Sequence, residues 1–141
     1  MQGIELDLDA YQVIFREGDP SEDLYYLKSG KVIVCTITGT QVKAISRIGS
    51  GEFIGELSFF DGCPRSSYVV TLEKCKLFQI PKKDISTQLP NWFNEVGNAL
   101  TKKIRLLDQV IQESNLRKSN SEENRPLSIE EQRKIYGLLT N

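Results

Sequence analysis

Short runs of β-branched and aromatic residues alternate with glycine-containing turns along the first part of the chain. The turns are Gly18-Asp19, Ser29-Gly30, Gly39-Thr40 and Gly49-Ser50-Gly51. The runs are Val13 to Phe15, Leu24 to Leu27, Val32 to Ile37, Val42 to Ile48, Tyr68 to Leu72 and Leu77 to Ile80. Runs of this length and composition predict strands. Several strands at this spacing indicate a barrel or a sandwich.

The period of the apolar residues changes after Pro81. Beyond Pro90 they recur at steps of three and four, as Val96, Leu100, Ile104, Leu107 and Ile111. This spacing predicts a helix over residues 91–117, roughly 40 Å long at 1.5 Å per residue. Because a small barrel cannot cover such a length, we expect a homodimer through the 91–117 helix, with a seam from Leu100 to Ile111. The alternative is a helix that packs only on its own barrel.

The last part of the chain predicts a linker and a second, shorter helix. Residues 118–126 are polar, and Ser128 and Glu131 have capping-box spacing. A helix this short is marginal alone, so we expect it to dock on the domain, on a second subunit or on a partner. The expected organisation is a domain over residues 1–117, a linker over 118–126 and a short helix within 127–141.

The longest interruption of the strand pattern contains the most informative motif. It reads Phe53-Ile54-Gly55-Glu56-Leu57-Ser58, and Arg65-Ser66-Ser67 follows it. A glycine lets the backbone approach a ligand, a short helical turn presents free amides to an anion, and arginine offers donors suited to phosphate. A carboxylate such as Glu56 only accepts hydrogen bonds, so beside an anion it would face a hydroxyl such as a ribose 2′-OH. Together these features indicate a nucleotide.

The motif resembles the phosphate-binding cassette of the cyclic nucleotide-binding domain family. That family has Phe-Gly-Glu-Leu-(Ala/Ser) followed by Arg-(Ser/Thr/Ala)-Ala. Here Ile54 is an extra residue, and Ser67 replaces the usual alanine. Upstream segments also resemble the family's first hairpins, so the similarity covers roughly residues 11–117. It implies a mainly β fold with α-helices: a double-stranded β-helix, or jelly roll, with the cassette and a long C-terminal helix.

The resemblance also implies ligand roles. Gly55 and Glu56 would hold the ribose, while Arg65, Ser66 and amides near Leu57 and Ser58 would hold the phosphate of cAMP or cGMP. Ser67 completes the candidate set. The alternatives are a surface ion pair between Glu56 and Arg65, and serine hydroxyls bonded only to backbone.

Base recognition departs from the family pattern. In bacterial cyclic-AMP-responsive regulators a Thr-Ser pair contacts adenine, and Leu107 and Asp108 fall at those positions. Both are base-contact candidates. Asp108 would accept from guanine N1–H and its amino group, or from the adenine amino group. The alternative is a solvated Asp108 paired with Arg105 or Lys102.

The composition of the chain argues against several classes of function. The chain has 141 residues, 39% of them hydrophobic and 26% charged, which is ordinary for one small domain. It has three scattered cysteines and no histidine, and it lacks a signal-peptide pattern or an apolar run long enough for a bilayer. We therefore expect a cytoplasmic protein without metal, membrane contact or catalytic residues, and not an enzyme.

A net charge of −1 and a pI near 5.6 argue against a nucleic-acid partner. The expected function is a cyclic nucleotide sensor that signals to a protein effector. The alternative is a degenerate fold that serves as a dimerisation scaffold or binds another ligand, such as a cyclic dinucleotide. The sequence does not choose between cAMP and cGMP, identify the effector or say whether the natural chain continues past Asn141.

Overall fold

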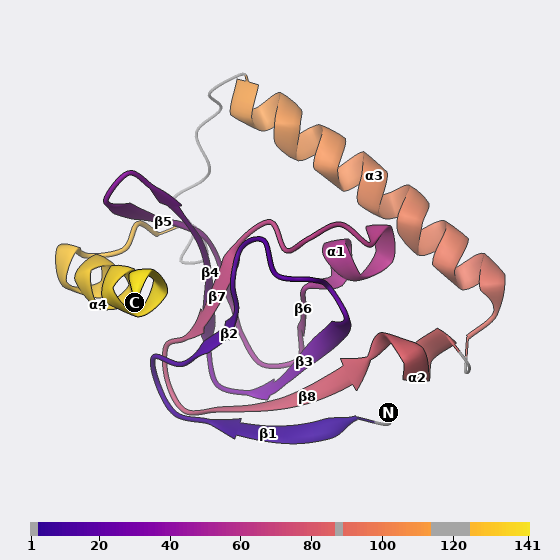
Figure 1. The fold of residues 1–141 in the computed structure, drawn as a ribbon, viewed down its shortest axis with the longest axis horizontal. Coiled ribbons are helices and arrows are strands. Elements are labelled where there is room, and N and C mark those ends of the chain that lie inside the picture. The colour runs from indigo at the N-terminus through magenta and orange to yellow at the C-terminus, as the bar shows by residue number, and fades with distance from the viewer. Residues whose placement is uncertain (1–2, 87–88, 114–124) are drawn as a thin grey trace.

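Two four-stranded antiparallel sheets form the body of the computed structural model, which describes residues 3–86, 89–113 and 125–141 (Figure 1). The first sheet has the order β1-β8-β3-β6 and the second the order β2-β7-β4-β5. The strands are β1 (Ile4–Leu8), β2 (Val13–Phe15), β3 (Asp23–Ser29), β4 (Val32–Thr38), β5 (Gln41–Ile48), β6 (Phe53–Ile54), β7 (Tyr68–Thr71) and β8 (Cys75–Pro81). The helices are α1 (Glu56–Asp61), α2 (Lys82–Ser86), α3 (Asn91–Glu113) and α4 (Ile129–Thr140).

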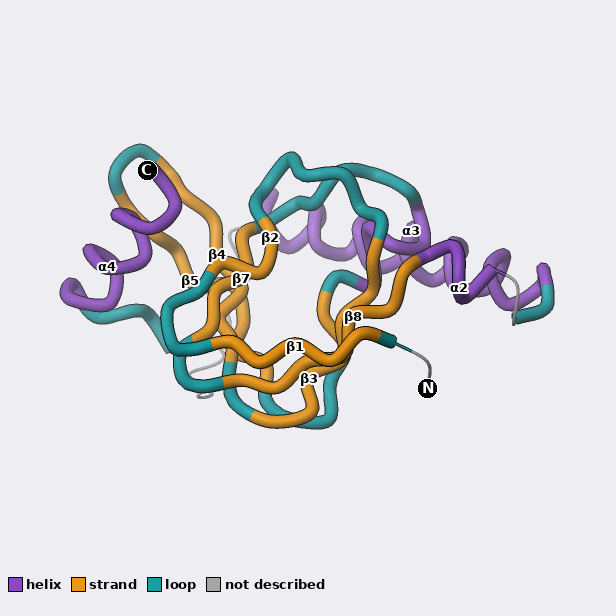
Figure 2. Tube along the Cα trace, turned by 60° about the horizontal axis from the view of Figure 1, so that its bottom comes forward, coloured by secondary structure: helices purple, strands orange, loops and turns teal. Residues whose placement is uncertain are grey.

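The predicted jelly roll with a long C-terminal helix is confirmed. Figure 2 shows the strands curving around a common interior, and all of the predicted strands are present. The sequence missed β1, because its Glu5 and Asp7 are residues that strands usually disfavour. These carboxylates lie on an edge strand, where Glu5 pairs with Lys28 of β3 and Asp7 with Lys76 of β8. Charged residues on an edge strand keep it from pairing with other chains.

The strands present different side chains to the two faces of the second sheet. Val32 and Val69 belong to the cluster inside the barrel, while Ile33 and Val70, one residue further along each strand, belong to a cluster on the outer face. This alternation follows from the period of two in a strand. The barrel is therefore filled from inside, and its outer apolar face needs a cover.

The C-terminal helix α4 provides that cover. Leu127, Ile135 and Leu139 are buried against the outer face of the sheet. The predicted capping box is present: Glu131 N–H donates to Ser128 Oγ at 3.1 Å, and Ser128 N–H donates to Glu131 Oε1 at 3.1 Å. The sequence left three docking surfaces open for this helix: the domain, a second subunit and a partner. In the structure α4 docks on the domain. The predicted linker falls largely on residues 118–124, which lie outside the described ranges.

The long helix α3 begins at Asn91, as predicted, and its predicted end near Arg117 lies outside the described residues. It packs on α1, where Gly97 allows very close contact: a Cβ at that position would lie 2.3 Å from two ring carbons of Phe60. Most of its apolar residues are uncovered, since Leu100 is 54% exposed and Leu107 is 61% exposed. The structure thus leaves an apolar stripe along α3.

Two helical glycines should respond oppositely to alanine. Gly137→Ala in α4 meets open space, so it should stabilise the fold by about 1 kcal/mol through helix propensity. Gly97→Ala gains the same propensity but forces α3 away from Phe60, so its net effect should be a loss of about 1 to 3 kcal/mol. Denaturant unfolding of both variants measures this. Equal stabilisation by both would contradict the packing of α3 on α1.

Candidate functional site

A cavity of about 310 Å³ opens where the cassette interrupts the barrel. One side is formed by β6, Gly55 and the start of α1, and the other by the segment before β7 and by the inner faces of β4 and β5. The described residues that line it are Phe15, Val34, Ile45, Ser46, Ile48, Glu52, Phe53, Gly55, Glu56, Leu57, Ser58, Ser66, Ser67 and Val69. Six of the seven ligand-binding candidates are among them, and Arg65 lies outside this set.

Gly55 sets the direction of the cassette. Its φ of 81° lies in the left-handed region, where the chain turns from β6 into α1, and Gly55 is the N-cap residue of that helix. Its carbonyl accepts the N–H of Phe59 at 3.1 Å, which closes the first turn. The amides before Phe59 point away from the helix and have no partner within it. Leu57 and Ser58 can therefore present N–H groups at the cavity.

Arg65 lies directly behind Gly55 and is only 3% exposed. Its Nη1 donates to the Gly55 carbonyl at 2.9 Å, and its Nη2 donates to the Asp23 carbonyl. The guanidinium also stacks over the ring of Phe15, 4.2 Å from the ring centroid. Burial lowers the pKa of Arg65, against the opposing effect of Tyr25 and Asp23, but an arginine remains charged at any physiological pH. The site therefore holds a fixed positive charge next to its glycine.

Glu56 brings a carboxylate to the same cavity. Its pKa is raised, mainly because surrounding protein removes water from the carboxyl group and also because Glu52 repels its charge. Its own backbone N–H and the charge of Arg65 act in the opposite direction. Nη1 and Nη2 of Arg65 donate to backbone carbonyls, and the guanidinium is buried. Arg65 and Glu56 therefore do not form the simple surface ion pair that was the alternative.

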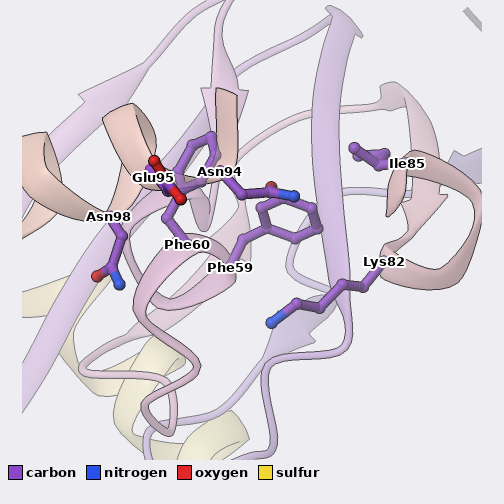
Figure 3. A pocket seen from close by; sticks show the side chains of 7 residues that line it. All are labelled: Phe59, Phe60, Lys82, Ile85, Asn94, Glu95 and Asn98. Atoms are coloured by element: carbon purple, nitrogen blue, oxygen red, sulfur yellow. The ribbon is translucent and has the colours of Figure 1, made fainter. Parts of the chain in front are cut away.

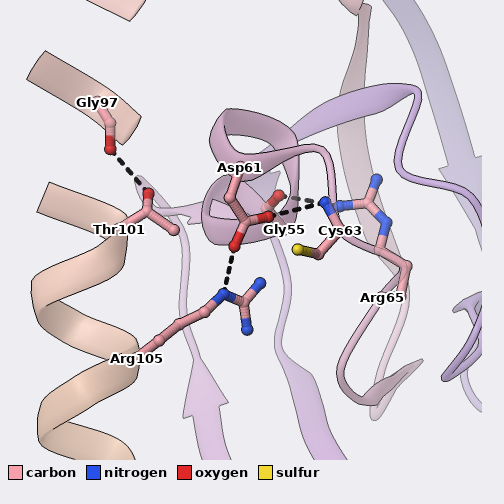
Figure 4. Close-up of polar contacts among 7 residues, drawn as sticks. All are labelled: Gly55, Asp61, Cys63, Arg65, Gly97, Thr101 and Arg105. Atoms are coloured by element: carbon pink, nitrogen blue, oxygen red, sulfur yellow. Dashed lines mark hydrogen bonds and ion pairs between the residues drawn. The ribbon is translucent and has the colours of Figure 1, made fainter. Parts of the chain in front are cut away.

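The far end of α1 is tied to α3 (Figure 4). Arg105 donates through Nε to Asp61, whose other carboxylate oxygen accepts the N–H of Cys63 at 2.9 Å. Thr101, which is buried, donates to the Gly97 carbonyl at 2.8 Å on the same face of α3. Movement of the cassette helix would therefore be passed to α3 through both packing and charge.

The hydrogen bond between Arg105 and Asp61 should affect how folding stability depends on pH. Burial raises the pKa of Asp61, but hydrogen bonds from Arg105 and Cys63 and the charge of Arg105 outweigh it, so the pKa is lowered. A carboxyl with a lowered pKa stabilises the fold above about pH 4, and this contribution is lost as the pH falls through the folded pKa. Asp61→Asn should remove that part of the acid sensitivity. Asp108→Asn, at an exposed position on α3, should retain that acid sensitivity. Denaturant unfolding of both variants from pH 3 to 7 measures the difference. Identical acid profiles for the two variants would exclude a stabilising role for the Asp61–Arg105 contact.

Two other hollows lie beside α1. One of about 350 Å³ lies between α1, α2 and α3, where Phe59 and Phe60 meet Asn94 and Asn98 of α3 (Figure 3). The other, of about 740 Å³, is a mostly apolar groove that shares Glu52, Phe53 and Glu56 with the cassette cavity. Neither hollow is lined by the serines or by the glycine of the cassette. The groove therefore lacks side-chain donors for a phosphate, while the smaller hollow has donors in Lys82, Asn94 and Asn98 but none of the cassette's ligand-binding candidates.

The described residues contain no cluster of His, Cys, Asp and Glu suited to hold a metal ion. Over the same ranges, no helix combines the length and apolarity needed to cross a membrane.

The model of the family described as "Cyclic nucleotide-binding domain" matches residues 5–90 of this chain. The chain belongs to this family. The match contains the whole cassette from Phe53 to Ser67, so the geometry described above is that of a cyclic nucleotide-binding domain. The resemblance noted in the sequence is confirmed.

Two bacterial proteins and one solved structure illustrate what this domain is similar to. The Cyclic AMP receptor protein of Thermus thermophilus is 31% identical over 99 residues, which cover 67% of this chain and 46% of that protein. The CRP-like protein Clp of Xanthomonas campestris pv. campestris is 32% identical over 113 residues, covering 73% and 48%. The chain thus spans about half the length of these relatives. The cAMP-bound structure of the EAL enzyme Bd1971 aligns with a TM-score of 0.64 at 26% identity, covering 79% of this chain and 32% of that one.

The two base-contact candidates do not line the cavity in this structure. Leu107 and Asp108 are exposed on α3, and neither is among the described residues that line the cavity. Arg105, one of the two cations offered as a partner of Asp108, contacts Asp61 instead. The role of Leu107 and Asp108 in base recognition stays a prediction.

Several residues of the cavity were missed by sequence reasoning. Phe15, Val34, Ile45 and Ser46 line it from strands that are far from the cassette in the chain. Their inward direction follows from strand alternation, but that pattern does not say which inward residues lie at the opening and which are packed in the core. The sequence therefore identified the cassette and not the wall opposite to it.

Proposed function

We propose that this domain is a sensor that binds cAMP or cGMP in the cassette cavity. One observation carries the proposal. Gly55, the carboxylate of Glu56 and the cassette serines converge on a single cavity of about 310 Å³, and the buried Arg65 lies behind the glycine. This is the combination that a cyclic phosphate joined to a ribose requires: positive charge and donors at one end, and an acceptor of hydroxyl hydrogens at the other.

The phosphate would lie at the start of α1. Amides of Leu57 and Ser58 and the hydroxyls of Ser66 and Ser67 provide donors there, and Arg65 provides the charge. Nε of Arg65 is buried and has no hydrogen-bond partner among the described residues, so it is a donor that an anion would satisfy. Glu56, at the same cavity, would accept from the ribose 2′-OH while it is ionised.

The output, we infer, is conformational rather than catalytic. Because α1 is joined to α3 at Gly97 and Arg105, closure of the cassette on a nucleotide would move α3. That movement would bring Leu107 and Asp108 to the base, or would change how the exposed apolar stripe meets a second subunit. The signal would then reach a protein effector in the cytoplasm.

Thermal unfolding with a panel of nucleotides tests the proposal. A ligand that binds only the folded state adds about 2.7 kcal/mol of stability at a concentration one hundred times its dissociation constant. We expect cAMP or cGMP to raise the midpoint, and AMP and GMP, which lack the cyclic ester, to serve as controls. If neither cyclic mononucleotide shifts the midpoint at millimolar concentration, the domain is a scaffold or takes another ligand. A shift with a cyclic dinucleotide alone would identify the second case.

A further inference from the structure

The turn that supports Arg65 also contacts the end of α4. Gly18 donates its backbone N–H to the Arg65 carbonyl at 2.8 Å, and Arg65 donates its own N–H to the Asp19 carbonyl at 2.9 Å. The carboxylate of Asp19 accepts the N–H of Arg16 at 2.9 Å and closes the turn. The backbone of Arg65 is therefore held on both sides by residues 16–19, which we call the Arg16–Asp19 turn.

The side chain of Arg16 extends from this turn to α4. Its Nη1 donates to the Leu139 carbonyl at 3.2 Å, and its Nη2 donates to the Leu138 carbonyl at 3.4 Å. Carbonyls in the last turn of a helix have no partner within the helix and carry the negative end of its dipole. The half-buried Arg16 therefore stabilises the docked position of α4.

α4 also lies on the outer side of the cavity wall. Val34 and Ser46, on β4 and β5, face the cavity, while Ile33 and Cys35 face the other side of the same sheet and belong to the cluster that α4 covers. Arg47 of β5 donates to the carbonyl of Arg125, just before α4. The helix thus contacts two of the elements that shape the site.

The docking of α4 can be gained or lost as a unit. The helix has 12 residues, too few for a stable isolated helix, and it relies on the burial of Leu127, Ile135 and Leu139. If it left the sheet, Arg16 would lose its acceptors and the cavity wall would lose its outer packing. α3 offers a poorer route from the site to α4, because its principal contacts are with α1 (Figure 1).

We propose that docking of α4 and occupancy of the cassette cavity are positively coupled, with Arg16 as the positioning residue that links them. The proposal rests on the proposed function, because it describes regulation of the same ligand site. Docked α4 steadies the Arg16–Asp19 turn, and the turn holds Arg65 where its guanidinium meets the phosphate. By linkage, the ligand strengthens the docking of α4, and a partner that draws α4 off the sheet weakens ligand binding by the same factor.

Calorimetry and hydrogen exchange on the full chain test the coupling with ligand present. Arg16→Ala should weaken binding of cAMP or cGMP by roughly 5- to 20-fold, and Arg16→Lys should recover part of the loss. Arg133→Ala, which removes an exposed arginine from α4 itself, is the matched control and should bind as the wild type does. Nucleotide should slow exchange over residues 129–140 in the wild type and not in Arg16→Ala. Unchanged exchange there in a wild type that binds nucleotide, with normal affinity of Arg16→Ala, overturns the coupling and leaves the proposed function intact.

A second measurement needs no ligand. Ile135→Ala removes a fully buried side chain from α4 without touching the turn. It should speed exchange of the α4 amides and also that of the Arg65 N–H, which bonds to the turn. If the Arg65 N–H exchanges as in the wild type, or if the α4 amides do, the coupling is wrong. Faster exchange at both places without any nucleotide binding would overturn the proposed function and retain only the link between α4 and the Arg16–Asp19 turn.

Discussion

Replacing Gly55 with alanine is expected to reduce cyclic nucleotide affinity by about 100-fold or more, because the loss of two charge-assisted hydrogen bonds costs at least about 3 kcal/mol. A Cβ on Gly55 would lie 2.3 Å from Nη1 of Arg65 and 3.1 Å from its Cζ. The guanidinium would have to move, yet it is buried over the ring of Phe15 and bonded to two carbonyls. Its displacement would remove the charge from the phosphate position. Calorimetric titration measures the affinity.

Gly51→Ala separates this effect from simple backbone strain. Gly51 has a φ of 92°, close to the 81° of Gly55, but an added Cβ there meets no atom within 4 Å. Both substitutions should cost about 1 to 2 kcal/mol of folding stability for a left-handed alanine, and Gly55→Ala should cost more because its Cβ also displaces the buried guanidinium of Arg65. Only Gly55→Ala should lose ligand affinity. Equal affinity losses in the two variants would mean that contact with Arg65 is not what requires a glycine at position 55.

Leu107→Glu is expected to convert a homodimer into monomers, because it places a charge in the apolar stripe of α3. Leu107 is 61% exposed in the single chain and shares the stripe with Leu100 and Ile111. Burying an unpaired carboxylate in an apolar seam costs several kcal/mol, which would raise the dissociation constant by about 100-fold or more. Sedimentation measures the change in mass.

The matched control is Gln109→Glu. It introduces the same charge on the same helix, but residues two apart in a helix lie about 200° apart around its axis. Gln109 therefore faces away from the stripe, and its Nε2 donates to Glu113 on an exposed surface. This variant should remain dimeric. A wild type of 16.0 kDa at all concentrations would contradict the homodimer.

The cassette could be predicted because its chemistry is local. Gly55, Glu56 and Ser58 are neighbours in the chain, and the left-handed turn needs its glycine wherever the rest of the fold lies. Arg65 was also identified as part of it. Its burial behind Gly55 could not be predicted, because that depends on Phe15 and on the carbonyl of Asp23, which the barrel brings there from another hairpin.

The positions of the two C-terminal helices could not be predicted from the sequence either. Their existence follows from periodicity and from the capping box at Ser128, but their positions do not. Docking of α4 depends on an outer sheet face that alternation implies only once the inner face is known, and on Arg16, which is more than one hundred residues away. The contact of Arg105 with Asp61 likewise joins segments that no local pattern connects.

Calorimetric titration of the wild type and of Gly55→Ala with cAMP and with cGMP decides whether the cassette cavity binds a cyclic mononucleotide. We expect one site per chain with an affinity in the micromolar range for at least one of the two nucleotides, because a few charge-assisted bonds hold a rigid ligand. We also expect Gly55→Ala to bind about 100-fold more weakly or not measurably. No binding of either nucleotide to the wild type, or equal binding by the two proteins, would contradict the proposed role of the cassette.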